Sequence, residues 1–211
     1  MNISLAEGYA KGAENFFTIA EAAFSSGVKY FTIWGASEDN LKKRSRAEVK
    51  ILTFLLKKEL KKLLDSGKLV KDEIAMHIVG NGLRIIKDKE ATRLAEEIEE
   101  TTKHFSGRHM TFLFGYDGKM EMLSAIKKLR DEKVSHVTYD SVKSHLLTRD
   151  LPPVDFVIRT GGEPHWSAGF LMWHTADSEF YFPETYWPAF HPKDLKLAFA
   201  DYSTRRSLKG K

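Results

Sequence analysis

The sequence has 211 residues, and its 33 lysines and arginines outnumber its 29 aspartates and glutamates, which gives a formal net charge of +4. Its hydrophobic content of 42% is enough for one globular domain with a sizeable core. It contains no cysteine, which excludes disulfides and cysteine-bound metals. The mild basic excess suits an anionic substrate or a lipid surface. Without a recognisable motif, it does not support nucleic acid as a partner.

No stretch of the sequence predicts a signal peptide or a membrane span. The first residues lack a basic start followed by a long apolar core. No apolar run approaches the ~18 residues that a spanning helix needs. With the absence of cysteine, this pattern predicts a cytoplasmic protein. Any contact with a membrane is then expected to be peripheral.

Helices and strands alternate along the chain. Recurring apolar residues predict helices at residues 5–25, 47–66, 91–104, 120–129, 141–147 and 192–202. Short apolar runs predict buried strands at residues 30–34, 76–79, 110–114 and 156–159. Residues 35–40 are expected to form a loop. Residues 203–211 are expected to form a basic tail that frays.

This order of elements predicts the class of fold. A single α/β domain covering residues 1–211 is expected, with a mostly parallel sheet flanked by helices on both faces. The four predicted strands are expected to be internal to that sheet, and the crossovers to be right-handed. In the helix at residues 47–66, the apolar stripe that should face the sheet consists of Val49, Leu52, Leu56, Leu60 and Leu63.

The strongest candidate site follows the strand that begins at Phe156. That strand stops at Arg159, and Gly161 and Gly162 come soon after. The planar guanidinium of Arg159 suits a phosphate, and the glycines can turn the chain and offer backbone N–H groups to the same anion. Because ligands of α/β sheets bind beyond the carboxyl ends of strands, this motif predicts an oxyanion or diphosphate site. The alternative is a plain surface turn in which Arg159 pairs with Glu163.

A second polar cluster, Ser37, Asp39 and Asn40, follows the strand at residues 30–34. These side chains could hold a diphosphate or guide a proton. They could equally form an Asx-rich turn that caps the next helix. The residues alone leave both interpretations open.

Longer motifs resemble a known family. One set of motifs resembles the C-terminal signature of the cis-prenyltransferases, the undecaprenyl diphosphate synthases. It consists of the run from Val157 to Glu163, Ser167, and residues 170–173, 178–182 and 187–190. Residues 32–40 are similar to the family segment that ends Ser-x-Glu-Asn-Trp. Residues 8–12 and 116–121 resemble the family motifs Gly-His-x-x-Gly and Tyr-Gly-Gly-Arg-x-Glu.

The resemblance implies a transferase. Such an enzyme condenses isopentenyl diphosphate with an allylic diphosphate in cis, uses Mg²⁺, and houses the growing chain in a hydrophobic tunnel. The resemblance also implies a homodimer, or a heterodimer with a complete homologue.

The family motifs imply roles for individual residues. Asn40 takes the position associated with removal of a proton, with Ser37 and Asp39 beside it, and Glu179 takes that of the Mg²⁺ ligand. The implied binding site for isopentenyl diphosphate consists of Arg159, Gly161, Gly162, His165 and Ser167, and Lys43 is implied to be a further substrate-binding residue.

The sequence also departs from the family pattern. Three residues stand where the family has arginine, namely Leu5, Lys43 and His165. Tyr9 replaces a family histidine, and Leu41 replaces a family tryptophan. The N-terminal segment Asp-Gly-Asn-x-x-Arg-Trp, which binds the allylic diphosphate in the family, has no counterpart in the 211 residues. An alternative function is therefore that of a degenerate, non-catalytic subunit or an isoprenoid diphosphate-binding protein. A third hypothesis is an unrelated anion-binding α/β protein.

Overall fold

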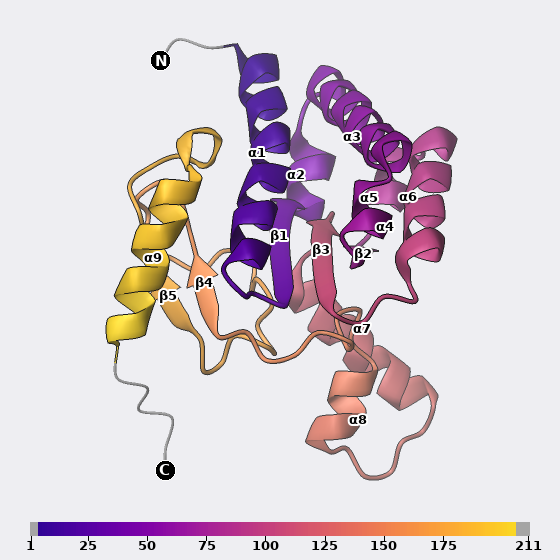
Figure 1. Ribbon diagram of the computed structural model, residues 1–211. Coiled ribbons are helices and arrows are strands. Elements are labelled where there is room, and N and C mark those ends of the chain that lie inside the picture. Colours follow the sequence, from indigo (N-terminus) through magenta and orange to yellow (C-terminus); the bar gives the residue numbers. More distant parts are fainter. Residues whose placement is uncertain (1–3, 206–211) are drawn as a thin grey trace.

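The computed structural model describes residues 4–205, and its strands form two small parallel sheets (Figure 1). The first sheet contains β1 (Tyr30–Ala36), β2 (Ile74–Val79) and β3 (Arg108–Phe114) in the order β1-β3-β2. The second pairs β4 (Phe156–Ile158) with β5 (Glu179–Tyr181). Every strand pair is parallel. The predicted parallel α/β fold is thus confirmed.

The prediction that all four strands are internal is wrong. In the described part of the chain, β3 alone has a strand on each side, while β1, β2 and β4 lie at edges. β5 was not predicted as a strand. It is three residues long and forms through its pairing with β4, from Phe156 opposite Glu179 to Ile158 opposite Tyr181. Periodicity within a segment carries no information about such pairing.

The six predicted helices are confirmed within a few residues. They are α1 (Leu5–Ser25), α3 (Arg46–Ser66), α6 (Lys89–Thr102), α7 (Gly118–Asp131), α8 (Tyr139–Ser144) and α9 (Pro192–Thr204). Sequence periodicity missed several short helical segments. These are α2 (Glu38–Lys43), α4 (Lys68–Lys71), α5 (Gly82–Ile86) and the 3₁₀ helix η1 (Trp187–Ala189). The loop predicted at residues 35–40 is accordingly wrong in part, because β1 extends to Ala36 and α2 begins at Glu38.

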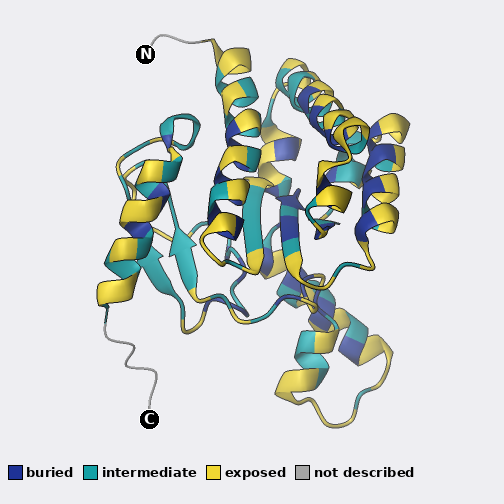
Figure 2. Cartoon of the chain, viewed as in Figure 1, coloured by how far each residue is buried: buried dark blue, intermediate teal, exposed yellow. Residues whose placement is uncertain are grey.

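Three helices cover one face of the three-stranded sheet. Phe16 of α1, Leu60 of α3 and Ile98 of α6 are buried in one cluster with Met76 of β2 and Met110 of β3. Figure 2 shows these buried faces turned toward the strands. The predicted apolar stripe of α3 therefore packs as expected.

Loop segments, rather than the expected second layer of helices, cover the opposite face of the same sheet. Leu113 points to this side of β3 and packs with Tyr116, Leu151 and Leu171, all buried. The chain after β4 thus closes over the sheet and brings the loop that follows Arg159 close to the carboxyl ends of the strands. This packing positions the candidate site.

None of the helices among residues 4–205 combines the length and the apolar character that crossing a membrane requires. Of the predicted basic tail, residues 206–211 lie outside the described residues. Arg205 is described, and it is ordered by ion pairs rather than frayed.

Candidate diphosphate site

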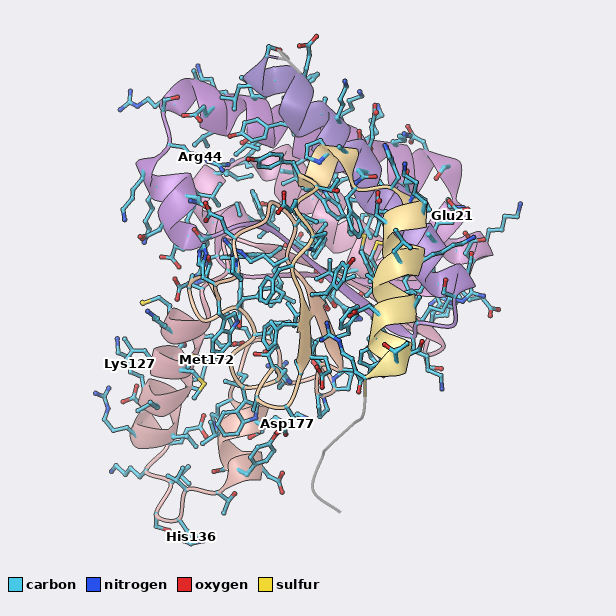
Figure 3. The ribbon with its side chains drawn as sticks, turned by 90° about the vertical axis from the view of Figure 1, so that its left-hand side faces the viewer. Glu21, Arg44, Lys127, His136, Met172 and Asp177 are labelled. Carbon is cyan, nitrogen blue, oxygen red and sulfur yellow. The ribbon has the colours of Figure 1, made fainter. Side chains whose placement is uncertain are left out.

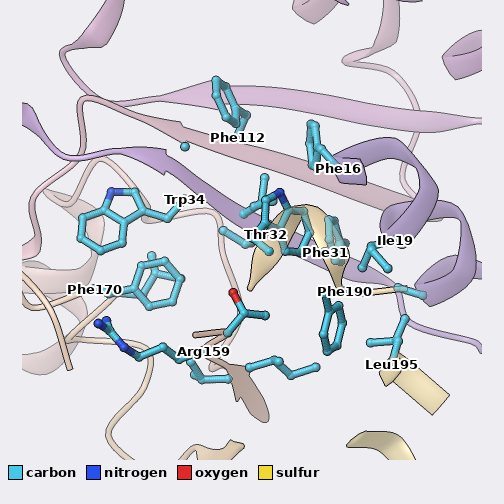
Figure 4. Close-up of a pocket in the computed structure, with 18 of the residues that line it drawn as sticks. Phe16, Ile19, Phe31, Thr32, Trp34, Phe112, Arg159, Phe170, Phe190 and Leu195 are labelled. Atoms are coloured by element: carbon cyan, nitrogen blue, oxygen red, sulfur yellow. The ribbon is translucent and has the colours of Figure 1, made fainter. Parts of the chain in front are cut away.

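A cavity of about 1280 Å³ lies between the two sheets. It is lined by apolar residues of α1 and α3 and by the full lengths of β1 and β4. Figure 4 shows Arg159, Trp34 and Phe170 together at one end, with Ile19 and Leu195 toward the other. The cavity is therefore lined mostly by apolar residues, and the cation Arg159 lies at the end beside Trp34 and Phe170.

The strands on either side of this cavity each have one unpaired edge. β1 pairs with β3 and β4 pairs with β5, and in the described chain neither strand has a second partner. All seven residues of β1 line the cavity, as do all three of β4. Backbone N–H and C=O groups at such an edge are strong hydrogen-bonding groups that a hydrocarbon cannot satisfy.

Arg159 is the centre of a polar cluster at the end of β4. Its Nε donates to the backbone oxygen of Glu163 at 2.8 Å, and its Nη1 donates to Ser167 Oγ at 2.9 Å. Its Nη2 lies 3.0 Å from His165 Nε2, which is also 3.0 Å from Ser167 Oγ. The structure thus brings together Arg159, His165 and Ser167, which the sequence had separated by up to eight residues. Within residues 4–205, two of the five N–H donors of the guanidinium have no partner and could bind a ligand.

The alternative interpretation of Arg159, a surface pair with the carboxylate of Glu163, does not match the structure. Arg159 bonds the backbone oxygen of Glu163, and the Glu163 carboxylate lies instead 3.6 Å from His165 Nδ1. Arg159 is also half-buried and lines the cavity. Its guanidinium is held by its own loop and faces the cavity rather than being neutralised by an acid.

Gly161 and Gly162 have a different role from the expected one. Both have positive φ, +100° and +72°, which L side chains rarely adopt. Their N–H groups donate to the backbone oxygen of Pro183, at 3.1 and 3.0 Å. The expectation that these N–H groups face an anion is therefore wrong. The glycines make the turn that places Arg159, and the turn is fixed to the segment after β5.

Ser37 and Asn40 form a helix cap. Ser37 Oγ accepts from the Asn40 N–H at 3.0 Å, and the Ser37 N–H donates to Asn40 Oδ1 at 3.4 Å. This reciprocal pair is the capping box of α2, which agrees with the capping interpretation. Ser37 is buried directly after Ala36, which lines the cavity, whereas Asn40 is exposed.

Asp39 and Lys43 pair with each other on the surface of α2. The Lys43 Nζ is 2.6 Å from Asp39 Oδ2, and both side chains are mostly exposed. The hydrogen bond from Lys43 lowers the pKa of Asp39. Neither residue lines the cavity.

Glu179 lies at the other end of the two-stranded sheet from Arg159. It pairs in register with Phe156, the first residue of β4, whereas Arg159 follows the last. Its Oε2 accepts from Arg205 Nη1 at 3.0 Å, and Arg205 also binds Asp201. Among residues 4–205 no three acidic or histidine side chains gather in a way that could hold a metal ion. The Glu179 carboxylate is thus paired with Arg205 in this structure, and its role as a Mg²⁺ ligand stays a prediction.

Sequence motifs did not reveal the buried polar network beneath the site. Glu121 accepts a hydrogen bond from the Tyr116 hydroxyl at 2.6 Å and from both the N–H and the hydroxyl of Thr148 at 2.9 Å. Thr148 Oγ1 lies 2.9 Å from His174 Nε2, and all four side chains are buried. Burial raises the pKa of Tyr116 and lowers that of His174. The phenol consequently stays protonated and donates to Glu121.

This network holds the loop that carries His165 and Ser167. The N–H of Gly118, at the start of α7, donates to the backbone oxygen of Ala168 at 3.0 Å. A Cβ at Gly118 would lie only 1.8 Å from the oxygen of Gly169. Glycine at position 118 therefore allows the loop to approach α7. Residues 116–121 thus have a structural role in placing the site.

The N-terminal and C-terminal motifs meet in space. Trp187 Nε1 donates to the backbone oxygen of Gly12 at 2.8 Å, and a Cβ at Gly12 would lie 3.3 Å from the Trp187 ring. The Asn15 side chain donates to the backbone oxygens of Trp187 and Phe190, at 2.7 and 2.8 Å. These bonds fix α1 against the segment that follows β5 and close one side of the cavity.

Comparison with known proteins places this arrangement in a family. Residues 2–210 match the family model described as putative undecaprenyl diphosphate synthase. The chain belongs to this prenyltransferase family. Its members are enzymes, so the third hypothesis, an unrelated anion-binding protein, is wrong.

Individual cis-prenyltransferases are similar over nearly the whole chain. An isoprenyl transferase of Aquifex pyrophilus is 35% identical over 204 residues, which cover 97% of this chain and 86% of that protein. An isoprenyl transferase of Thermus thermophilus is 30% identical over 221 residues, covering 100% of this chain and 82% of that protein. The crystal structure of lavandulyl diphosphate synthase from Lavandula x intermedia, in complex with dimethylallyl diphosphate, superimposes with a TM-score of 0.89. It is 25% identical, and the match covers 99% of this chain and 90% of that one.

One departure from the cis-prenyltransferase motifs has a visible consequence. Tyr9, where the resemblance implies a histidine, lines the cavity, and its ring centroid lies 5.3 Å from the guanidinium carbon of Arg44. Figure 3 shows Arg44 beside the upper helices. A cation over a tyrosine face is an attractive contact. This pair therefore connects α1 to the segment between α2 and α3.

Proposed function

We propose that this chain takes part in the condensation of isopentenyl diphosphate with an allylic diphosphate in cis, the reaction of polyprenyl diphosphate synthesis. The observation that carries the proposal is the Arg159–His165–Ser167 cluster at one end of a long apolar cavity. An isoprenoid diphosphate has an anionic head that suits the polar cluster and a hydrocarbon tail that suits the apolar cavity. Membership of the prenyltransferase family supports the assignment.

In the proposed reaction, the allylic C–O bond breaks and the diphosphate leaves with the electron pair. The double bond of isopentenyl diphosphate attacks the allylic carbon to form the new C–C bond, and a proton is then lost. Arg159, with His165 and Ser167, would hold the diphosphate of isopentenyl diphosphate by charge-assisted hydrogen bonds. The aromatic and aliphatic lining would keep water away from the carbocation.

The remaining predicted site residues enter as part of the same proposal. Gly161 and Gly162 would act by shaping the Arg159 turn. Ser37, Asp39 and Asn40 would act between the two substrates, with Asn40 near the departing proton and Lys43 supplying charge. Their support is the family motif and the position of Ser37 next to the cavity-lining Ala36.

We propose further that a strand from outside residues 1–211 inserts between β1 and β4. Both bordering strands have unpaired edges along the cavity, which a strand can satisfy and a hydrocarbon cannot. The resemblance implies a strand that ends in Asp-Gly-Asn-x-x-Arg-Trp, supplied by a longer chain or by a complete homologue. Its aspartate would provide a carboxylate for Mg²⁺ in addition to Glu179, which is paired with Arg205.

The second candidate function is a non-catalytic subunit that keeps the fold. Two observations favour it: Glu179 is engaged by Arg205, and Asp39 by Lys43. Both candidates share the diphosphate site at Arg159. They differ in whether this chain completes a reaction or contributes to a partner's site.

The first test measures binding of isopentenyl diphosphate to the diphosphate site that both candidate functions share. Titration of residues 1–211 in a calorimeter is expected to show saturable binding, because Arg159 offers two free N–H donors to an anion beside an apolar cavity. Inorganic diphosphate is expected to compete. A flat titration with both compounds would contradict the proposal.

We propose that the molecule is a dimer and that α7 forms the interface. Met120, Leu123 and Ile126 lie at helical spacing on α7 and are 49%, 42% and 55% exposed. Figures 1 and 3 both show α7 and α8 standing apart from the helices around the cavity. Several large apolar side chains exposed on one helix can serve as an association surface.

Light scattering at micromolar concentration is expected to give the mass of a dimer. The variant Ile126→Glu is expected to be monomeric, because it would bury a charge in the interface. Lys127→Glu, on the neighbouring position of the same helix, is the control and should remain dimeric. A monomeric wild-type chain would rule out the homodimer, and a dimeric Ile126→Glu would exclude α7 as the interface.

A further inference from the structure

One polar residue interrupts the apolar stripe of α3. Leu55 and Leu56 precede Glu59 by one turn and Leu60 follows it, and all four residues line the cavity. Glu59 is only 7% exposed. Its Oε2 is buried and has no hydrogen-bond partner among the described residues. The exposed Lys62 is close by, with its Nζ 4.0 Å from that oxygen.

A carboxyl group in such surroundings is unusual. Glutamates are rarely buried without a partner, because removing a polar group from water costs free energy unless hydrogen bonds replace those to water. The leucines around Glu59 cannot provide them. The distance to Lys62 is at the limit for an ion pair, and the Lys62 side chain is exposed to solvent. Any molecule that fills the cavity next to Glu59 therefore changes how well this group is solvated.

Glu59 and the candidate diphosphate site come from different elements around the cavity. Glu59 is on α3, whose Leu60 belongs to a buried cluster with Met76 of β2, the strand that β3 separates from β1. Its neighbour Leu60 packs with Ile74, the first residue of β2. Arg159, in contrast, follows the carboxyl end of β4. A prenyl tail whose diphosphate is at Arg159 would thus reach Glu59 with its distal part.

We propose that Glu59 determines specificity by limiting the length of prenyl tail that the cavity accepts. The inference rests on the proposed function in treating this cavity as the site of the tail. Isoprene units that contact leucines and phenylalanines gain affinity by burying apolar surface. A unit that reaches Glu59 covers an unpartnered carboxyl oxygen and gains little or nothing. Affinity should therefore stop rising once the tail reaches this residue.

The test compares two prenyl alcohols, farnesol and geranylgeraniol, which differ by one isoprene unit and need no diphosphate site. Their binding can be followed by tryptophan fluorescence, because Trp34 and Trp187 line the cavity. In the wild-type chain the two alcohols are expected to bind with similar affinity. In Glu59→Leu, geranylgeraniol is expected to gain about tenfold over farnesol. Glu59→Gln, which stays polar, should keep the wild-type ratio.

Asp65→Leu is the matched control, because it makes the same kind of substitution on the same helix at an exposed position. Its ratio should equal that of the wild type. Thermal unfolding checks that each variant folds, and Glu59→Met serves in place of Glu59→Leu if the leucine variant does not. An unchanged ratio in a folded apolar variant would overturn the proposal for Glu59.

The corresponding diphosphates separate this inference from the proposed function. If farnesyl and geranylgeranyl diphosphate bind no more tightly than their alcohols, the diphosphate site at Arg159 is contradicted. The ratio between the two alcohols would still decide the role of Glu59. If neither alcohol binds to the wild-type chain, the cavity does not hold prenyl tails, and the inference fails together with that part of the proposed function.

Discussion

Replacing Arg159 by alanine is expected to weaken the binding of isopentenyl diphosphate by about 2–4 kcal/mol, the scale for loss of a charge-assisted partner of a partly desolvated anion. Arg159 is half-buried and lines the cavity, and its guanidinium is held by Glu163, His165 and Ser167. The alanine variant would lose the charge and leave Ser167 and His165 without their common partner. Calorimetry on both proteins measures the difference.

Two further variants make this result specific. Arg159→Lys keeps the charge but not the planar fork, so it should recover only part of the affinity. Arg149→Ala removes an arginine that is 53% exposed and lies beside Asp150, outside the cavity lining. It should bind as the wild type does. Equal affinity of Arg159→Ala and the wild type would remove Arg159 from the site.

The central part of the site was predictable from the sequence because it is local. Arg159, His165 and Ser167 lie within nine residues after an apolar strand, and a strand end with glycines predicts a turn that gathers them. The identity of the helices was predictable for a similar reason. Each long helix carries several turns of apolar spacing, as α1 and α3 do over 21 residues each.

Features that depend on pairing were not predictable. β5 exists because Glu179–Tyr181 aligns with β4, and the separation of β1 from β4 depends on what lies between them. The role of Gly161 and Gly162 depends on Pro183, about twenty residues away, whose backbone oxygen accepts both N–H groups. Spacing along the chain does not show such contacts.

Small or polar elements were missed for a different reason. α2 is six residues long and mostly charged, so it has no apolar period, and its Ser37–Asn40 cap resembles a turn. Glu59 fits the spacing of the apolar stripe of α3 but not its chemistry. A glutamate between lysines indicates a solvated surface, whereas the structure buries it.

Condensation by residues 1–211 alone is expected to be close to background. The resemblance implies an aspartate for Mg²⁺ that these residues do not include, and it implies arginines where His165 and Leu5 stand. The loss of one donor to a developing charge typically costs ~10²–10³ in rate. Such losses need not add, but several together leave little turnover. The open edges of β1 and β4 indicate where the missing groups would enter.

A fused strand offers a sharp version of this experiment. An apolar strand that ends in Asp-Gly-Asn-x-x-Arg-Trp would be joined ahead of α1, long enough to pair with the seven residues of β1. Its aspartate→alanine version is the matched control, because it fills the cavity without restoring the carboxylate. Mixing the chain with a complete homologue is the equivalent test for a second subunit.

The measurement that decides most directly is the incorporation of radiolabelled isopentenyl diphosphate into product with farnesyl diphosphate. The account predicts background incorporation by residues 1–211 alone and robust incorporation by the fused chain. It also predicts loss of that incorporation in the fused chain with Arg159→Ala. Robust product from residues 1–211 alone would contradict it, because Asp39, Glu179 or another carboxylate of this chain would then be sufficient for the work assigned to the inserted strand.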